Sequence, residues 1–265
     1  MTKFKLLNII TLLFILILFT IQLFFEFSIF LFISIFALIL VAYSSYLFIG
    51  SYFICSNIYI KTICKVNTNK NSIVLSFDDG PDLIVTPLIL NILKEKNVKA
   101  IFFLKGINAE KYPEIIKNIV EDGHIIGNHT FSHTTYLAFT NRKKYSLEIE
   151  QTNDLISCFT GQSPRFFRPP FGVLNPIIAS VIKKYGMITI GWSIRSFDGG
   201  NCSADVILSK LKNKIHAGAI ILFHDTNPVT VNVLKDFLDY LAQTDFKVER
   251  LDKLLNCDAL SLSKC

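Results

Sequence analysis

The stretch from Leu6 to Ile60 constrains the fold most, because its 55 residues carry one formally charged side chain, Glu26. As a helix it would be about 80 Å long at roughly 1.5 Å per residue, whereas the hydrocarbon core of a bilayer is about 30 Å thick. A single transmembrane span cannot accommodate a helix of that length. The stretch therefore predicts two transmembrane helices, Lys5–Phe25 and Ser28–Phe53, with Glu26 and Phe27 near the turn between them.

A cleaved signal peptide is the alternative interpretation of the same segment. Signal peptides use an apolar region of about 7 to 15 residues, and this one is several times longer. Small residues in Val41–Ser45 would nevertheless suit cleavage. We expect residues 1–60 to form a two-span membrane anchor, which places the protein at the cell membrane.

Charge in the rest of the chain is balanced. The sequence has 27 Lys+Arg and 21 Asp+Glu residues, of which only Lys3, Lys5 and Glu26 precede Lys61. A balance of this kind does not resemble the basic stripe that binds nucleic acid, so we expect no nucleic-acid partner. We interpret the clusters 142–144 (R-K-K) and 183–184 (K-K) as solvated helix faces.

The six cysteines form no C-x-x-C pair, which argues against a cysteine zinc site. A disulfide between Cys257 and Cys265 stays open. Cysteine usage leaves the redox compartment undetermined.

Residues 61–71 are expected to be a polar linker, residues 72–256 a catalytic domain and residues 257–265 a tail. In the domain, short apolar runs alternate with amphipathic stretches, which is typical of βα units. The expected strands are Ile73–Phe77, Lys99–Leu104, His124–Asn128, Phe166–Arg168, Met187–Trp192, Ala219–His224 and Phe246–Glu249. The expected helices are Thr86–Lys96, Tyr112–Glu121, Asn141–Phe159, Asn175–Lys184, Ala204–Ile215, Val229–Ala242 and Leu251–Leu255.

Strands joined through helices predict a parallel sheet, since βαβ crossovers are right-handed by default. The sheet can stay open or close. We expect an α/β fold in which about seven strands close into an irregular (β/α) barrel.

Ionisable side chains follow the carboxyl ends of several expected strands. In βα barrels these ends share the rim where loops converge and catalytic residues lie. The residues in question are Asp78, Asp79, His129, His133, Arg168, Asp198, His224 and Asp225.

Two of these groups suggest a metal site. Asp78 and Asp79 precede Gly80-Pro81, which forces a turn and leaves adjacent carboxylates at the rim. His129 and His133 are spaced i, i+4, so on a helical turn both imidazoles would face one metal ion. Taken alone, an acidic turn is as often structural as functional, and a lone histidine is more often structural. The combination of the two favours a metal.

Two other rim residues have neighbours in the sequence that restrict their position. Arg168 is followed by Pro169-Pro170-Phe171-Gly172, a stiff loop that carries a guanidinium, and His224 ends an apolar strand. His124 and His216 lie outside the rim set, and we expect both to be structural.

Five motifs in order resemble the polysaccharide deacetylases of carbohydrate esterase family 4, the NodB-homology domain. They read S-F-D-D-G, N-H-T-F-S-H, R-P-P-F-G, W-S-I-R-S-F-D-G and L-F-H, and the resemblance covers about residues 72–255. It implies an enzyme that hydrolyses the N-acyl (acetyl) amide of an amino sugar in a glycan.

The resemblance also implies roles for individual residues. Zn²⁺, or another divalent transition metal, would be held by Asp79, His129 and His133. Asp78 would be the general base and Arg168 would hold it. His224 would be the general acid, tuned by Asp198. The backbone N–H of Phe171 would face the oxyanion, and Leu222 would line the pocket for the acyl methyl group.

The fourth motif departs from the family pattern. Arg195 stands where the family usually has an aspartate, and Gly199 where it has a tryptophan. The change alters the wall of the sugar groove and puts the substrate in question rather than the chemistry. Trp192 is expected in the core.

Two other functions remain to be separated from deacylation. A catalytically silent glycan-binding homologue would not need base, metal ligands and acid together. An iron oxygenase also uses two histidines and a carboxylate, but Asp78 and His224 suit hydrolysis better.

The side of the membrane on which the catalytic domain lies is predicted from a small number of charged residues. Lys3 and Lys5 precede the first span, Lys61 and Lys65 follow the second, and by the positive-inside tendency both ends face the cytoplasm. The substrate there would be a lipid-linked sugar precursor at the inner leaflet. An extracellular glycan is the alternative, and the sequence does not specify which glycan is used.

Overall fold

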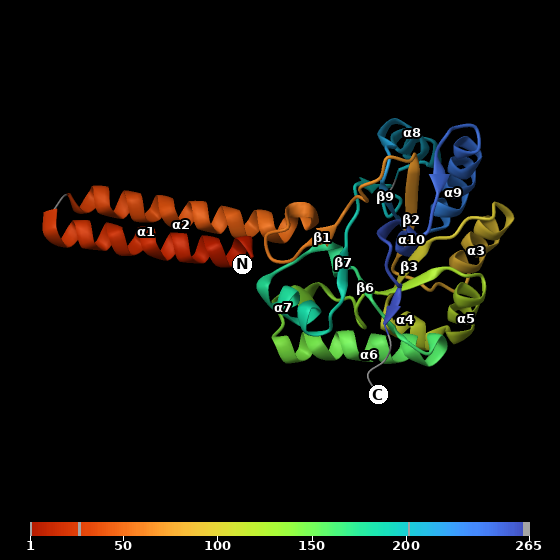
Figure 1. Ribbon diagram of the computed structural model, residues 1–265, viewed down its shortest axis with the longest axis horizontal. Coiled ribbons are helices and arrows are strands. Elements are labelled where there is room, and N and C mark those ends of the chain that lie inside the picture. The colour runs from red at the N-terminus through yellow and green to blue at the C-terminus, as the bar shows by residue number, and fades with distance from the viewer. Residues whose placement is uncertain (1, 26–27, 201, 262–265) are drawn as a thin grey trace.

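The computed structural model describes residues 2–25, 28–200 and 202–261, which form a long helical hairpin joined to one α/β domain (Figure 1). The expected turn at Glu26 and Phe27 and the open question of Cys265 lie outside the described residues.

The hairpin consists of α1 (Lys3–Phe25) and α2 (Ile29–Tyr52), close to the predicted spans. Most of its apolar side chains are exposed, and the two helices meet through contacts such as Phe19 against Phe32, with ring centroids 5.1 Å apart. Both helices are long and apolar enough to cross a membrane, by length and composition. Apolar helices that bury so little against protein need an apolar environment of another kind.

The hairpin joins the domain without a flexible connection. The 3₁₀ turn η1 (Ile54–Ser56) follows α2 at once, and Leu174 N–H donates to Ser51 O at 3.2 Å. A disulfide joins Cys55 to Cys64, a pairing that the sequence did not indicate. Residues expected in the linker then form β1 (Thr62–Ile63), which pairs with β7 (Ile188–Ile190) of the main sheet.

The main sheet is parallel and curls into a half-barrel, which confirms the expected irregular (β/α) barrel. Its order is β1-β7-β6-β4-β3-β2-β9-β8, with β10 beside β2. An isolated bridge between Lys65 and Ala219 brings the segment after β1 to the start of β9. The remaining strands are β2 (Ser72–Asp78), β3 (Ile101–Leu104), β4 (Ile125–Asn128), β6 (Phe166–Phe167), β7 (Ile188–Ile190), β8 (Ile194–Arg195), β9 (Ile220–His224) and β10 (Lys247–Val248).

β8 was not predicted, and a separate small sheet pairs β5 (Ser163–Pro164) with β11 (Leu260–Ser261). The expected helices are present with ends shifted by at most one residue. They are α3 (Val85–Glu95), α5 (Pro113–Glu121), α6 (Arg142–Thr160), α7 (Pro176–Lys184), α8 (Ala204–Lys214), α9 (Pro228–Leu241) and α10 (Leu251–Leu255). A short helix, α4 (Gly106–Lys111), and the 3₁₀ turns η2 (Thr135–Phe139) and η3 (Pro170–Gly172) were not predicted.

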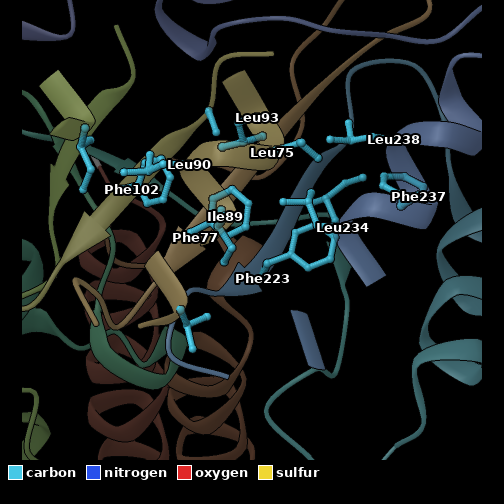
Figure 2. Packing of buried hydrophobic residues seen from close by; sticks show 14 of the residues in the cluster. Leu75, Phe77, Ile89, Leu90, Leu93, Phe102, Phe223, Leu234, Phe237 and Leu238 are labelled. Atoms are coloured by element: carbon cyan, nitrogen blue, oxygen red, sulfur yellow. The ribbon is translucent and has the colours of Figure 1, made fainter. Parts of the chain in front are cut away.

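Aromatic packing fixes the central strands. Phe77 of β2 stacks on Phe102 of β3 and on Phe223 of β9, with ring centroids 5.0 and 5.7 Å apart, under α3 and α9 (Figure 2). Burying a phenylalanine side chain stabilises a fold by about 1.5–3 kcal/mol, so these strands are held firmly in register. In that register Asp78 lies opposite His224. Packing of the core therefore places Asp78 and His224 side by side at the rim.

Candidate active site

The rim at the carboxyl ends of β2, β4, β6 and β9 surrounds a pocket of about 590 Å³. The structure brings together every site residue predicted from the sequence. Seven line the pocket: Asp78, Asp79, His129, His133, Phe171, Leu222 and His224. Arg168 and Asp198 are fully buried and contact Asp78 and His224 respectively.

Three side chains are arranged to hold a metal ion. One ligand atom from each of Asp79, His129 and His133 lies within 4.8 Å of the others. Asp79 Oδ1 is 3.3 Å from His133 Nε2 and 3.8 Å from His129 Nε2, and this buried oxygen has no hydrogen-bond partner among the described residues. His129 Nδ1 lies 2.7 Å from the carbonyl oxygen of Arg168, so Nε2 is the nitrogen left for a ligand.

Protonation also suits metal binding. Burial and the neighbouring His129 lower the pKa of His133 to about 4, which leaves its imidazole neutral near pH 7. Burial would raise the pKa of Asp79, but the charges of His129 and Lys105 outweigh it and lower that pKa. A neutral imidazole and an ionised carboxylate are the forms that bind a metal.

The loop that carries the two histidines is not the expected helical turn. Residues 129–134 contain no helix, and both Thr130 and His133 have positive φ, 64° and 51°. Glu148 of α6 holds the loop, because its carboxylate accepts hydrogen bonds from Phe131 N–H, Ser132 N–H and Ser132 Oγ–H at 2.7–3.0 Å. The i, i+4 spacing selected two histidines that do converge, but the expected helical turn was wrong. Glu148 was not predicted, because it lies far along the chain.

Asp78 is held by a buried arginine. Arg168 Nη1 donates to Asp78 Oδ1 at 2.7 Å and to Ser76 Oγ at 3.0 Å. Its other nitrogens donate to the carbonyls of Ile190 and Gly191, and its guanidinium lies 4.2 Å from the centroid of Phe103. Arg168 therefore fixes one oxygen of Asp78, while Oδ2 faces the histidines, 3.7 Å from His129 Nε2.

His224 stands on the other side of the pocket with a buried carboxylate behind it. Asp198 Oδ1 accepts from His224 Nδ1 at 2.7 Å, and Asp198 also accepts from Ser196 and Thr230 hydroxyls. Burial would lower the pKa of His224, but the hydrogen bond and charge of Asp198 raise it above its ordinary value. The imidazole therefore keeps its proton to higher pH than an ordinary histidine does, and its Nε2 is left free of Asp198.

Strained backbone gathers at this site. Apart from asparagines, the described non-glycine residues with positive φ are Asp79, Thr130, His133, Phe171 and Phe197, all in the loops around the pocket. Such conformations cost free energy and are kept where the surroundings require them. Phe171 has φ 57° and lies against His133, with ring centroids 4.7 Å apart.

The departures in the fourth motif shape one wall of the pocket. Arg195 ends β8, is exposed and lies over the ring of Phe197 at 5.4 Å. A side chain at Gly199 would start 3.7 Å from His224, so glycine leaves that side of the imidazole open. Trp192, expected in the core, is partly buried and also lines the pocket.

The sequence also drew attention to Asp225 and His124. Asp225, noted at the rim without a role, is buried next to Gly80, whose missing Cβ leaves room for its carboxyl group. Burial raises the pKa of Asp225 to about 7, and Thr86 Oγ1 donates to its Oδ2 at 2.8 Å. His124 lies outside the pocket and accepts from Ala100 N–H at 3.1 Å, as a structural histidine does.

Comparison with known proteins agrees with the motifs. A family model described as polysaccharide deacetylase matches residues 65–190. The chain is 42% identical over 158 residues to a peptidoglycan-N-acetylglucosamine deacetylase of Bacillus cereus, covering 60% of this chain and 57% of the relative. It is 32% identical over 181 residues to a chitooligosaccharide deacetylase of Azorhizobium caulinodans, covering 68% of this chain and 86% of the relative.

A solved structure of a peptidoglycan N-acetylglucosamine deacetylase, in complex with 4-naphthalen-1-yl-N-oxidanyl-benzamide, superimposes with a TM-score of 0.72 and 34% identity. The match covers 76% of this chain and 95% of that one. The chain thus spans a little over half the length of the Bacillus cereus relative, but nearly all of the chain in that solved structure.

Proposed function

Because the chain belongs to the polysaccharide deacetylase family, we propose that it is a metal-dependent hydrolase that removes N-acetyl groups from the amino sugars of a glycan. The observation that carries the proposal is one pocket with a metal-ligand triad and an arginine-held carboxylate facing an aspartate-backed histidine. Family membership favours hydrolysis over the iron oxygenase alternative. The retained base and acid argue against a silent glycan-binding homologue.

We propose that Asp79, His129 and His133 hold the metal and that the metal is Zn²⁺. Oδ1 of Asp79 accepts no hydrogen bond from the described residues, and Nε2 of His129 is left over once Nδ1 meets the Arg168 carbonyl; both support the fit. When bound, such an ion acts as a Lewis acid toward the amide carbonyl and lowers the pKa of water to about 7. Other divalent transition metals accept the same ligand set, so the choice of zinc is the finer part of the proposal.

Asp78 is the proposed general base. Arg168 holds Oδ1 of its carboxylate, so Oδ2 is aimed at the pocket and can accept the proton of the attacking water as the new C–O bond forms. The former carbonyl oxygen then carries negative charge, which the backbone N–H of Phe171 would stabilise by donating a hydrogen bond. Leu222 would contact the acetyl methyl group.

His224 is the proposed general acid. An amine is a poor leaving group until its nitrogen is protonated. Nε2 of His224 would give its proton to that nitrogen as the C–N bond breaks, and Asp198 would stabilise the imidazolium beforehand. The products are acetate and the free amino sugar.

The substrate is proposed to be a glycan that also carries acidic groups, as peptidoglycan does. Arg195 is an exposed cation in the pocket wall and makes no ion pair within the part of the chain that the structure describes. A carboxylate on the glycan would complement it. Arg195→Gln should raise KM about tenfold, or about 1.4 kcal/mol, for acidic fragments and leave neutral chitooligosaccharides unaffected.

We propose that α1 and α2 anchor the protein in the cell membrane with the domain outside the cytoplasm. The distribution of lysines favours the cytoplasm, as noted above. The disulfide between Cys55 and Cys64 favours an oxidising compartment, because cytosolic thiols are kept reduced. The disulfide is the stronger argument, since the lysine count rests on few charges.

The activity test uses the full-length protein in nanodiscs, loaded with Zn²⁺, and three substrates: acetylated peptidoglycan fragments, acetylated chitooligosaccharides and a lipid-linked aminosugar. Mass spectrometry should record loss of acetyl groups with the wild type and little loss with Asp78→Asn. Binding without any loss of acetyl groups would instead identify a silent homologue.

The placement test is separate. Protease added to intact spheroplasts should cleave the domain. A protected domain would place it in the cytoplasm, and a lipid-linked precursor would then be the better substrate.

A further inference from the structure

A surface patch beside the active site combines exposed aromatic and basic side chains. It consists of Tyr136 and Phe139 in η2 and Arg142, Lys143 and Lys144 at the start of α6, called here the η2–α6 patch. Phe139 is 89% exposed and Tyr136 is 81% exposed, the highest values among the large apolar side chains that the structure describes. Two aromatic rings of the domain are therefore exposed to solvent and contribute little to packing of the core.

The patch lies on the side of the domain that faces the hairpin. Asn175 Nδ2 donates to Ala138 O in η2 at 2.6 Å, and the adjacent Leu174 N–H donates to Ser51 O in the last turn of α2. Leu137 and Tyr145 pack in the same apolar cluster as Ile54, which directly follows α2. In Figure 1 α7 and the near end of α6 lie on the domain side closest to α1 and α2.

The basic residues occupy positions that helix stability disfavours. Arg142, Lys143 and Lys144 fill the first turn of α6, where the positive end of the helix dipole repels cations, and that turn has no acidic residue. All three side chains are exposed, and they form no ion pair with the described residues. A local cost of this kind points to a partner outside the domain.

We propose that the η2–α6 patch docks on the anionic headgroup region of the same bilayer that holds α1 and α2. Aromatic side chains favour the membrane interface, and juxtamembrane clusters of Lys and Arg are attracted to anionic lipids. α1 has 23 residues, about 35 Å of helix, so it fills the hydrocarbon core and ends near the headgroups. The domain begins there without a linker. The inference rests on the membrane placement in the proposed function.

Docking would orient the catalytic pocket. A second, apolar cavity of about 250 Å³ is lined both by Phe139 of the patch and by Pro170 and Phe171 of the loop after β6. Phe171 also lines the catalytic pocket. The patch and the reacting centre thus share a wall, and a docked patch sets the pocket beside the membrane surface.

Depth-dependent quenching tests the docking in the full-length protein. Phe139→Trp is reconstituted in nanodiscs that contain phospholipid brominated near the headgroup, and the quenching of native Trp192 is subtracted. Leu88→Trp, on α3 at the far side and 44% exposed, is the matched control. Leu38→Trp, near the middle of α2, is measured in separate discs whose phospholipid is brominated near the end of the acyl chain, and reports whether the hairpin is in the bilayer.

Quenching at positions 139 and 38 but not at 88 is the expected result. Quenching at 38 alone would overturn the docking and leave the anchor intact. No quenching at either 38 or 139 would overturn the membrane anchor as well. Equal quenching at 88 and 139 would mean that no face is preferred.

The charge contribution has its own control. The triple variant R142E/K143E/K144E should remove the increase in quenching of Phe139→Trp, about twofold, that anionic discs give over zwitterionic ones. K210E/K212E/K214E, with the same charge change on α8, should keep it. Both variants should still deacetylate a soluble oligosaccharide, which shows that they fold. If the first triple variant instead loses binding to an insoluble acidic glycan with unchanged quenching, the cations bind substrate and the lipid proposal is wrong.

Discussion

Arg168 donates from Nη1 to Oδ1 of Asp78 at 2.7 Å, and both side chains are buried. The pair joins β6 to the end of β2 through side chains that the sequence separates by 90 residues. A buried ion pair of this kind is costly to break from one side, because the remaining charge stays buried without a partner.

Replacing Arg168 should therefore affect both stability and turnover. Arg168→Lys retains the charge but cannot supply the planar set of donors that reaches Asp78, Ser76, Ile190 and Gly191. We expect unfolding free energy to fall by about 3 kcal/mol and kcat to fall at least about 100-fold. Thermal unfolding and steady-state kinetics measure the two effects. Arg165→Lys, on the surface, is the control, and an unchanged kcat in Arg168→Lys would remove its positioning role.

The adjacent carboxylates should separate by function. Asp79→Ala, His129→Ala and His133→Ala should each lose bound metal and activity, because each removes one of three ligands. Asp78→Asn should keep the metal and lose about 100-fold or more in kcat, because it removes a base. Metal content by mass spectrometry and kcat on one substrate give the comparison. Release of metal from Asp78→Asn, or normal metal in Asp79→Ala, would reverse the assignment.

Loss of the proton from His224 should set the alkaline limit of activity. Asp198 raises the pKa of His224, so the protonated acid persists to higher pH than an isolated imidazole would allow. In Asp198→Asn that pKa should fall, and the basic limb of the kcat/KM profile should move to lower pH. His224→Ala should reduce amide hydrolysis far more than hydrolysis of an activated ester, whose leaving group needs no proton. Equal losses on the two substrates would indicate a binding role for the imidazole.

His124 should limit stability in acid. Burial lowers its folded pKa to about 4 from an ordinary value of 6.5, so the unfolded chain binds the extra proton between these values. The stabilising contribution is complete above pH 6.5 and is lost as pH falls toward 4, amounting to roughly 3 kcal/mol. His124→Asn, which keeps an acceptor for Ala100 N–H, should flatten that part of the profile in thermal unfolding, and His216→Asn should not.

The site residues that could be predicted from the sequence are those at the ends of strands. Asp78 and His224 end buried strands, and His129 and Arg168 follow buried strands. Parallel strands end on one rim, so the pattern predicted that these residues meet. The loop geometry did not follow. Neither the positive φ of His133 nor the three hydrogen bonds to Glu148 have a local signal, because each depends on contacts made after the chain has folded.

The anchor connection was also beyond sequence reasoning. Six cysteines allow many pairings, and spacing alone does not choose Cys55 with Cys64. Polar composition suggested a linker at residues 61–71, whereas the pairing of Thr62 and Ile63 with β7 depends on a strand far along the chain.

The disulfide between Cys55 and Cys64 also limits how far the domain can move away from the hairpin. Cys64 Sγ packs so closely on Gly191 that a methyl group there would lie 2.5 Å from the sulfur, and the Gly191 carbonyl accepts from Arg168. The hairpin is therefore linked through short contacts to the residue that aims Asp78. A flexible tether would let a domain sample a shell of several tens of ångströms, at up to about 3.3 Å for each residue. With no such tether, and with the hairpin in a bilayer as proposed, the pocket would be held at one fixed height above the membrane surface.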